Sequence, residues 1–104
     1  MKRLLLFVLP LLLIVGCSKP INENSLIDRN GVKYQQDSQK PYSGKVFRLY
    51  DTGENKKEGI YKDGIQDGLQ TEWYKNGQKM FEKNYKDGIL ISKKGWESDG
   101  SVME

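Results

Sequence analysis

Hydrophobic and polar residues alternate within short segments of the chain that are separated by glycine-containing turns. Leu69, Thr71 and Trp73, for example, alternate with the polar Gln70 and Glu72. A period of two is typical of a β-strand that buries one of its faces. Glycine interrupts the pattern too often for a long helix, so we expect short strands separated by turns.

The alternating segments belong to an internal repeat. Adding 24 to a residue number in the first full copy gives the equivalent position in the second, so that Gly44 corresponds to Gly68. An incomplete third copy follows at a shift of 23, where Trp96 corresponds to Trp73. A fixed period of about 20 to 50 residues is typical of arrays in which each unit packs against its neighbours. The matched pairs in the two full copies are Gly44 and Gly68, Tyr50 and Tyr74, Gly53 and Gly77, Glu58 and Glu82, Tyr61 and Tyr85, and Gly64 and Gly88.

Two kinds of turn separate the segments. Both contain a glycine, mostly after Asn or Asp, and these residues tolerate the positive φ that a type I′ hairpin turn requires. We therefore predict an all-β fold, an antiparallel meander of repeated hairpins in one open sheet. Ser92-Lys93-Lys94 adds charge to the last copy and predicts a short terminal strand that caps the array. The first kind of turn lies at 51–54, 75–78 and 98–101, and the second at 62–64 and 86–88.

The beginning of the chain has a different character. Met1–Arg3 is basic, and Leu4–Val15 is apolar apart from Pro10. The apolar run is shorter than the roughly 20 residues that a membrane-spanning helix needs. This segment is therefore typical of the helical core of a signal peptide.

Ile14–Cys17 resembles the lipobox of bacterial lipoproteins, in which a small residue precedes a cysteine. The resemblance implies cleavage between Gly16 and Cys17, a diacylglyceryl group on the Cys17 thiol, and acylation of the new amine. Two or more acyl chains anchor a protein stably, because each buried methylene adds about 0.8 kcal/mol. An ordinary secretory signal is the alternative, but it leaves the single cysteine unexplained. Ser18 favours transport to the outer membrane if the host has two membranes.

These features divide the chain into three parts. Residues 1–16 are expected to form a lipoprotein signal peptide, 17–29 a lipidated flexible tether, and 30–104 the β-repeat domain. Leu26 and Ile27 are candidates for the first residues of the fold. The tether is mostly polar, and we expect it to hold the domain away from the membrane.

Gly68–Gln78 and Tyr85–Gly88 resemble MORN repeats, particularly the bacterial variant in the YwqK-type antitoxin family. The shared pattern is a glycine, an aromatic-rich strand, an Asn-Gly or Asp-Gly turn, a return strand and Tyr-x-Asp-Gly. Pro41–Val46 is similar to the start of that pattern. The resemblance implies an open β-sheet array, contacts with proteins or membranes and, in some members, neutralisation of a toxin. The lipobox departs from cytosolic antitoxins and predicts a location in the cell envelope.

Composition excludes several classes of function. The formal net charge of +3 becomes +1 (15 basic minus 14 acidic residues) when Lys2 and Arg3 are removed, which does not suggest a nucleic-acid partner. The chain has no histidine and one cysteine, so it lacks His-based catalytic triads, His metal sites and an internal disulfide. We expect no metal and no cofactor.

Two sets of acidic residues are explained by the repeat. The Asp-Gly pairs lack the other oxygen ligands of a calcium-binding loop, and turn geometry accounts for them. Glu58 and Glu82 could be taken for the paired carboxylates of a glycosidase, but they recur by duplication. We therefore expect no catalytic residue and no enzymatic activity.

Six aromatic residues could form either a ligand-stacking surface or the core of the sheet. Their recurrence with the repeat favours the core, and Tyr74, on the opposite face from Trp73, is the best candidate for a contact. Lysines near the turns either meet anionic lipid headgroups or line a solvated edge, and the interspersed acids favour the edge. The six aromatic residues are Tyr50, Tyr61, Trp73, Tyr74, Tyr85 and Trp96.

Three functions remain open. The first is a membrane-anchored, non-catalytic module that binds another protein or an envelope component through its sheet. The second is an antitoxin or immunity protein that neutralises a partner toxin. The third is a structural envelope lipoprotein without a discrete partner. In each of them the acylated Cys17 attaches the protein to a lipid bilayer.

Overall fold

The computed structural model describes residues 19–103. The expected signal peptide, its cleavage site at Gly16 and the lipidation site at Cys17 lie outside these residues. The described part is almost entirely β, as predicted, with one short 3-10 turn and no α-helix. Its elements are β1 (Ile21–Asn22), η1 (Glu23–Ser25), β2 (Ile27–Arg29), β3 (Val32–Tyr34), β4 (Gly44–Leu49), β5 (Asn55–Lys62), β6 (Ile65–Gln66), β7 (Gly68–Trp73), β8 (Lys79–Lys86) and β9 (Ile89–Gly95).

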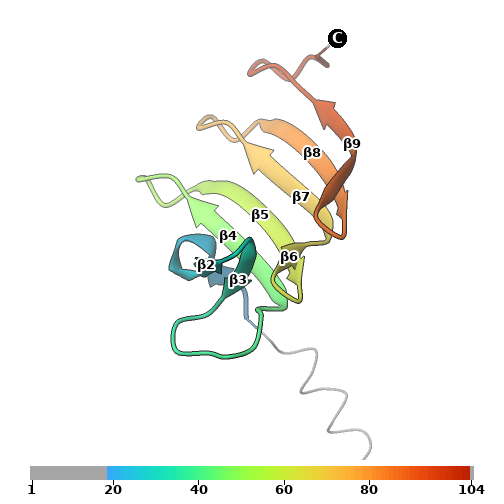
Figure 1. Cartoon of the computed structure of the whole chain (residues 1–104). Coiled ribbons are helices and arrows are strands. Elements are labelled where there is room, and N and C mark those ends of the chain that lie inside the picture. The colour runs from blue at the N-terminus through green and yellow to red at the C-terminus, as the bar shows by residue number, and fades with distance from the viewer. Residues whose placement is uncertain (1–18, 104) are drawn as a thin grey trace, which may run out of the picture.

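The main sheet follows the order of the chain. Its strands lie in the order β1-β4-β5-β7-β8-β9, with β6 paired to β5, and β2 and β3 form a separate hairpin. All neighbours are antiparallel except β1, which runs parallel to β4. Figure 1 shows the hairpins of β4 to β9 side by side in a single curved layer, with the small β2–β3 sheet against its β4–β5 end. No helix within residues 19–103 is long and apolar enough to cross a membrane.

The pairing register repeats with the sequence. Gly44 lies opposite Tyr61 in the first hairpin, and Gly68 lies opposite Tyr85 in the next. Each hairpin also carries a bulge near its turn, at Arg48/Leu49 and at Glu72/Trp73. The repeat in the sequence is therefore also a repeat of the structure.

The two kinds of turn have different backbone conformations. At the turns of the second kind, Asp63 and Asp87 have φ of 51°, and the following glycines are also positive, as a type I′ turn requires. At the first kind only the glycine, such as Gly77, has positive φ. There the Tyr74 carbonyl accepts from the Gly77 N–H at 3.0 Å. The type I′ prediction is wrong for this kind, because these are longer loops that place one left-handed glycine at a bulge.

Hydrogen bonds tie each copy to the next. The Tyr50 hydroxyl donates to the Trp73 carbonyl at 2.5 Å, and Tyr74 donates to the Trp96 carbonyl at 2.8 Å. The Gly88 N–H donates to the Gln66 carbonyl, in the preceding copy, at 2.8 Å. Tyr74 therefore joins neighbouring copies, and its expected role as a surface contact stays a prediction.

The fold begins earlier than expected. Ile21 and Asn22 pair with β4, and the Asn22 side chain accepts from the Asn24 N–H at 2.9 Å at the start of η1. Glu23 is buried, and β2 begins at Ile27. The tether predicted at 17–29 is therefore folded from Ile21 onward, and residues 18–20 alone separate Cys17 from β1.

The last strand also differs from the prediction. β9 has seven residues, so it is not short, and its first half is apolar rather than charged. The chain then folds back, with Trp96 bridged to Val102 and the Met103 N–H donating to the Gly95 carbonyl at 2.9 Å. The predicted charged cap therefore describes only the second half of the strand.

Candidate binding surfaces

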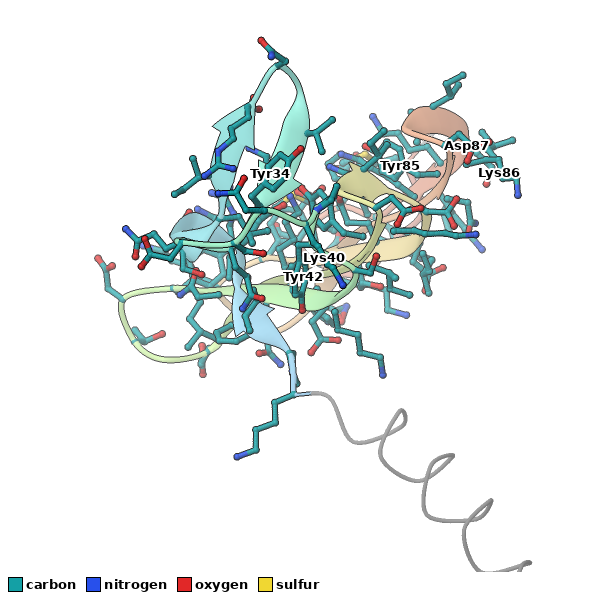
Figure 2. All side chains as sticks on the ribbon, turned by 60° about the horizontal axis from the view of Figure 1, so that its bottom comes forward. Tyr34, Lys40, Tyr42, Tyr85, Lys86 and Asp87 are labelled. Atoms are coloured by element: carbon teal, nitrogen blue, oxygen red, sulfur yellow. The ribbon has the colours of Figure 1, made fainter. Side chains whose placement is uncertain are left out.

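The sheet has two faces of different character. Residues that lie opposite each other in neighbouring strands point to the same face, so the register assigns each side chain. We call the first the apolar face, and it carries Phe47, Leu49, Ile60 and Leu69. We call the second the charged face, and it carries Arg48, Lys57, Glu72 and Lys83 beside the buried Glu23. Figure 2 shows side chains projecting from both sides of the ribbon.

The apolar face contains a shallow depression of about 590 Å³ over β4, β5 and β7. Leu49 and Leu69 remain 44% and 45% exposed in it, although each is a large hydrophobic residue. Lys45 and Glu58 also line it, and Pro20 borders it from the start of the described chain. Contiguous exposed apolar side chains with a polar rim are typical of an interaction surface.

The charged face is held together by its own ion pairs. Glu23 Oε1 accepts from Arg48 Nε at 2.6 Å and from Lys57 Nζ at 3.0 Å, and Glu23 Oε2 accepts from the Tyr61 hydroxyl at 2.6 Å. Burial alone would raise the pKa of Glu23, but the hydrogen bonds from Tyr61, Lys57 and Arg48 outweigh it and lower the pKa to about 2. Burial and the Glu23 carboxylate raise the pKa of Tyr61. This cluster therefore fastens η1 to the sheet and has no free acid or base for catalysis.

A second network lies farther along the same face. Glu72 Oε2 accepts from Gln70 Nε2 and from Lys83 Nζ, each at 2.9 Å. The Phe81 ring lies close to two ammonium groups, with Lys83 Nζ at 5.0 Å and Lys93 Nζ at 4.4 Å from its centroid. These contacts satisfy the polar groups internally, so this face offers fewer unpaired groups to a ligand than its composition suggests.

Glu58 and Glu82, which recur with the repeat, do not form a reactive pair of carboxylates. Thr71 lies between Glu58 and Glu82 in the register, and Glu82 Oε2 pairs with Lys79 Nζ at 2.7 Å. Asp28 Oδ1 accepts from the Gly31 N–H at 2.8 Å, which is turn geometry. Within residues 19–103 no three His, Cys, Asp or Glu side chains group in a way that could hold a metal ion.

The recurring aromatic residues contribute to packing between copies. Tyr61 is buried, and Tyr50, Trp73, Tyr74, Tyr85 and Trp96 are all half-buried. Two of them donate the hydroxyl bonds that join neighbouring copies. This arrangement supports the core interpretation over a continuous stacking surface.

The free edge of the sheet was not identified from the sequence. Ile89 and Ile91 of β9 are 69% and 62% exposed, and Leu90 between them is also exposed. Figure 2 shows Lys86 and Asp87, at the end of β8 and in the β8–β9 turn, at one end of the molecule. The signal was the run of three apolar residues directly after an Asp-Gly turn, where the other copy has Ile65-Gln66-Asp67.

Comparison of the chain with protein-family models, with curated proteins and with solved structures found no match. The functional argument therefore depends on the surfaces described above.

Proposed function

We propose that this protein is a lipid-anchored, non-catalytic β-repeat module that binds another protein through its apolar face. One observation carries the proposal: among the large hydrophobic residues of the described chain, more are exposed than fully buried. Val46 and Tyr61 are the buried hydrophobic residues of the described chain. Eight large hydrophobic residues are exposed, namely Leu49, Ile60, Ile65, Leu69, Ile89, Leu90, Ile91 and Val102.

The chemistry of the surfaces supports binding rather than catalysis. Glu23, the most strongly perturbed carboxylate, already accepts three hydrogen bonds. The depression on the apolar face is open and shallow, and an enzyme site normally encloses its substrate. A folded partner with a complementary apolar patch can bury Phe47, Leu49 and Leu69, while Lys45 and Glu58 at the rim select the partner by charge.

The anchor sets the location of this surface. Acylation of Cys17 would leave residues 18–20 as the connection to β1, which span at most about 10 Å when extended. The sheet would therefore lie close to the bilayer rather than far from it. This geometry supports a partner that is itself in the cell envelope. An immunity function is a special case in which that partner is a toxin.

The test uses a photocrosslinking amino acid at position 69, expressed in the native host. We expect a discrete protein adduct from position 69 and none from position 52, which lies in the exposed loop between β4 and β5. The additional change Leu49→Asp should abolish the adduct. If stable, correctly anchored protein gives no adduct at position 69, the binding proposal is wrong and a purely structural role is favoured.

The anchor is tested separately by metabolic labelling with a clickable fatty acid. The label should appear on the wild-type protein and disappear in Cys17→Ala. Co-expression with a toxin identified as the adduct distinguishes immunity from other binding, because only an immunity protein rescues growth. Equal labelling of Cys17→Ala would refute the lipoprotein assignment.

A further inference from the structure

The outer side of β9 has free backbone groups within the described chain. β8 pairs with one side of β9, from Gly95 to Ile89. On the other side, the Gly95 carbonyl accepts from the Met103 N–H at 2.9 Å. Because N–H and C=O directions alternate along a strand, Lys93, two residues earlier, also directs its backbone groups outward.

The repeat itself defines what belongs beside β9. In the preceding copy, β7 pairs with β8, and Trp73 lies opposite Lys79. In the last copy Trp96 lies opposite Val102 in the same way. The C-terminal residues therefore occupy the beginning of the next strand position. From Lys94 to Ile89 that position is open among residues 19–103.

The lysines in the second half of β9 determine which side chains fit opposite that half. Lys93 and Lys94 correspond to the uncharged Gln70 and Thr71 of β7. Neither lysine forms an ion pair within residues 19–103, and their ammonium groups lie over the Phe81 and Trp96 rings at 4.4 and 5.3 Å. Acidic side chains directly opposite them would form favourable cross-strand pairs.

The apolar side chains in the first half of β9 determine which side chains fit opposite the other half. In the preceding copy the Gln66 carbonyl accepts from Gly88 N–H, and Asp67 Oδ1 accepts from Asp87 N–H at 3.1 Å. The residues that correspond to Gln66 and Asp67 in β9 are the exposed Leu90 and Ile91. The side-chain acceptor for the turn of a further repeat is therefore missing. A strand with apolar side chains would bury this end instead.

A second copy of β9 does not match these requirements. The strand Ile89–Gly95 contains no acidic residue. Any antiparallel pairing of β9 with itself therefore sets its lysines opposite apolar residues, serine, glycine or other lysines. Like charges directly opposite each other destabilise a strand pair.

We propose that the outer side of β9 binds an extended segment of another protein as an added antiparallel strand. Acidic residues at the amino end of that segment lie opposite Lys94 and Lys93, and apolar residues follow opposite Ile91, Leu90 and Ile89. Addition of a strand to a sheet edge supplies affinity through main-chain hydrogen bonds and specificity through alternate side chains. This inference rests on the proposed function and names the chemistry of one partner segment.

The test measures peptide binding to the full-length protein, extracted with its anchor into detergent micelles. The probe is a fluorescent six-residue peptide with two glutamates, one threonine and three valines in that order, so that the valines lie opposite Ile91, Leu90 and Ile89. The control has the same residues in reverse order, which in an antiparallel strand sets the acids against Ile89 and Leu90. We expect the control to bind about tenfold more weakly in fluorescence anisotropy, from two lost cross-strand pairs. Equal binding of the two peptides would overturn the proposal.

Variants separate the charge from the backbone contribution. The double change Lys93→Glu and Lys94→Glu should reverse the preference, so that a peptide with two lysines binds best. Lys93→Ala keeps the outward N–H and Lys93→Pro removes it, so Pro should weaken binding beyond Ala. Circular dichroism verifies that both variants keep their β-structure. Equal binding by the Ala and Pro variants would refute strand addition.

The outcomes also separate this inference from the proposed function. Peptide binding without any adduct at position 69 in cells would refute the apolar-face proposal alone. An adduct at position 69 without peptide binding would refute strand addition alone. A dimer in sedimentation equilibrium that Lys93→Pro dissociates would show that a second copy occupies the edge, which overturns the proposed occupant.

Discussion

The Glu23 cluster gives the most quantitative prediction. The pKa of the Glu23 carboxyl group falls from an ordinary value of 4.5 to about 2 in the folded protein. A group whose folded pKa is lowered contributes stability above its unfolded pKa and loses it as the pH falls toward the folded pKa. The contribution is therefore complete above about pH 5 and disappears toward pH 2.

The magnitude follows from the size of the shift. One pKa unit corresponds to about 1.4 kcal/mol, so the change from 4.5 to about 2 gives about 3 kcal/mol at pH 7. At pH 3 the same two pKa values leave about 1 kcal/mol. A domain of this size has a total stability of about 5 to 10 kcal/mol, so the loss is large.

The assay compares urea unfolding of wild-type and Glu23→Gln protein at pH 7 and pH 3, both in a Cys17→Ala background. Glutamine keeps the shape of the side chain but cannot form the ion pairs with Arg48 and Lys57. We expect the free energy of unfolding of Glu23→Gln to lie well below that of the wild type at pH 7. At pH 3 this difference should shrink by more than half. The exposed Glu58→Gln is the control and should change little at either pH. A deficit of the same size at both pH values would refute the electrostatic argument.

Further substitutions test the repeat and the surfaces. Tyr74→Phe should cost about 1 kcal/mol in urea unfolding through its lost bond to the Trp96 carbonyl, and an unchanged midpoint would contradict the link between copies. Gly53→Ala should cost about 1 kcal/mol from its positive φ alone, since no atom lies within 4 Å of the added methyl group. Gly64→Ala should cost at least twice as much, because its methyl group would lie 2.8 Å from the Lys33 carbonyl oxygen, and equal costs would disprove this packing. Leu69→Asp should leave thermal unfolding within about 0.5 kcal/mol while it abolishes partner capture, and a large loss of stability would place Leu69 in the core.

Much of the fold could be predicted from the sequence because its determinants are local. Alternation in residues 69–73 and Asp-Gly at the second kind of turn each act within a short stretch of chain. Their recurrence from copy to copy then requires neighbouring hairpins to pair, which the register confirms. The conformation at Gly77 was not predicted because Asn-Gly is compatible both with a type I′ turn and with a longer loop that has one left-handed glycine. The bulge at Glu72/Trp73 favours the longer loop.

The two faces of the sheet could not be predicted from the sequence, because they depend on contacts between residues that are distant in the chain. Glu23 is separated from Lys57 by 34 residues and from Tyr61 by 38, so no local pattern predicts its burial or the early start of the fold. Leu69 and Ile91 have the composition of core residues, and only the absence of a covering layer in the described structure leaves them exposed. Alternation along a strand determines which residues share a face. Whether that face is covered depends on which other parts of the chain, or which partner, pack against it.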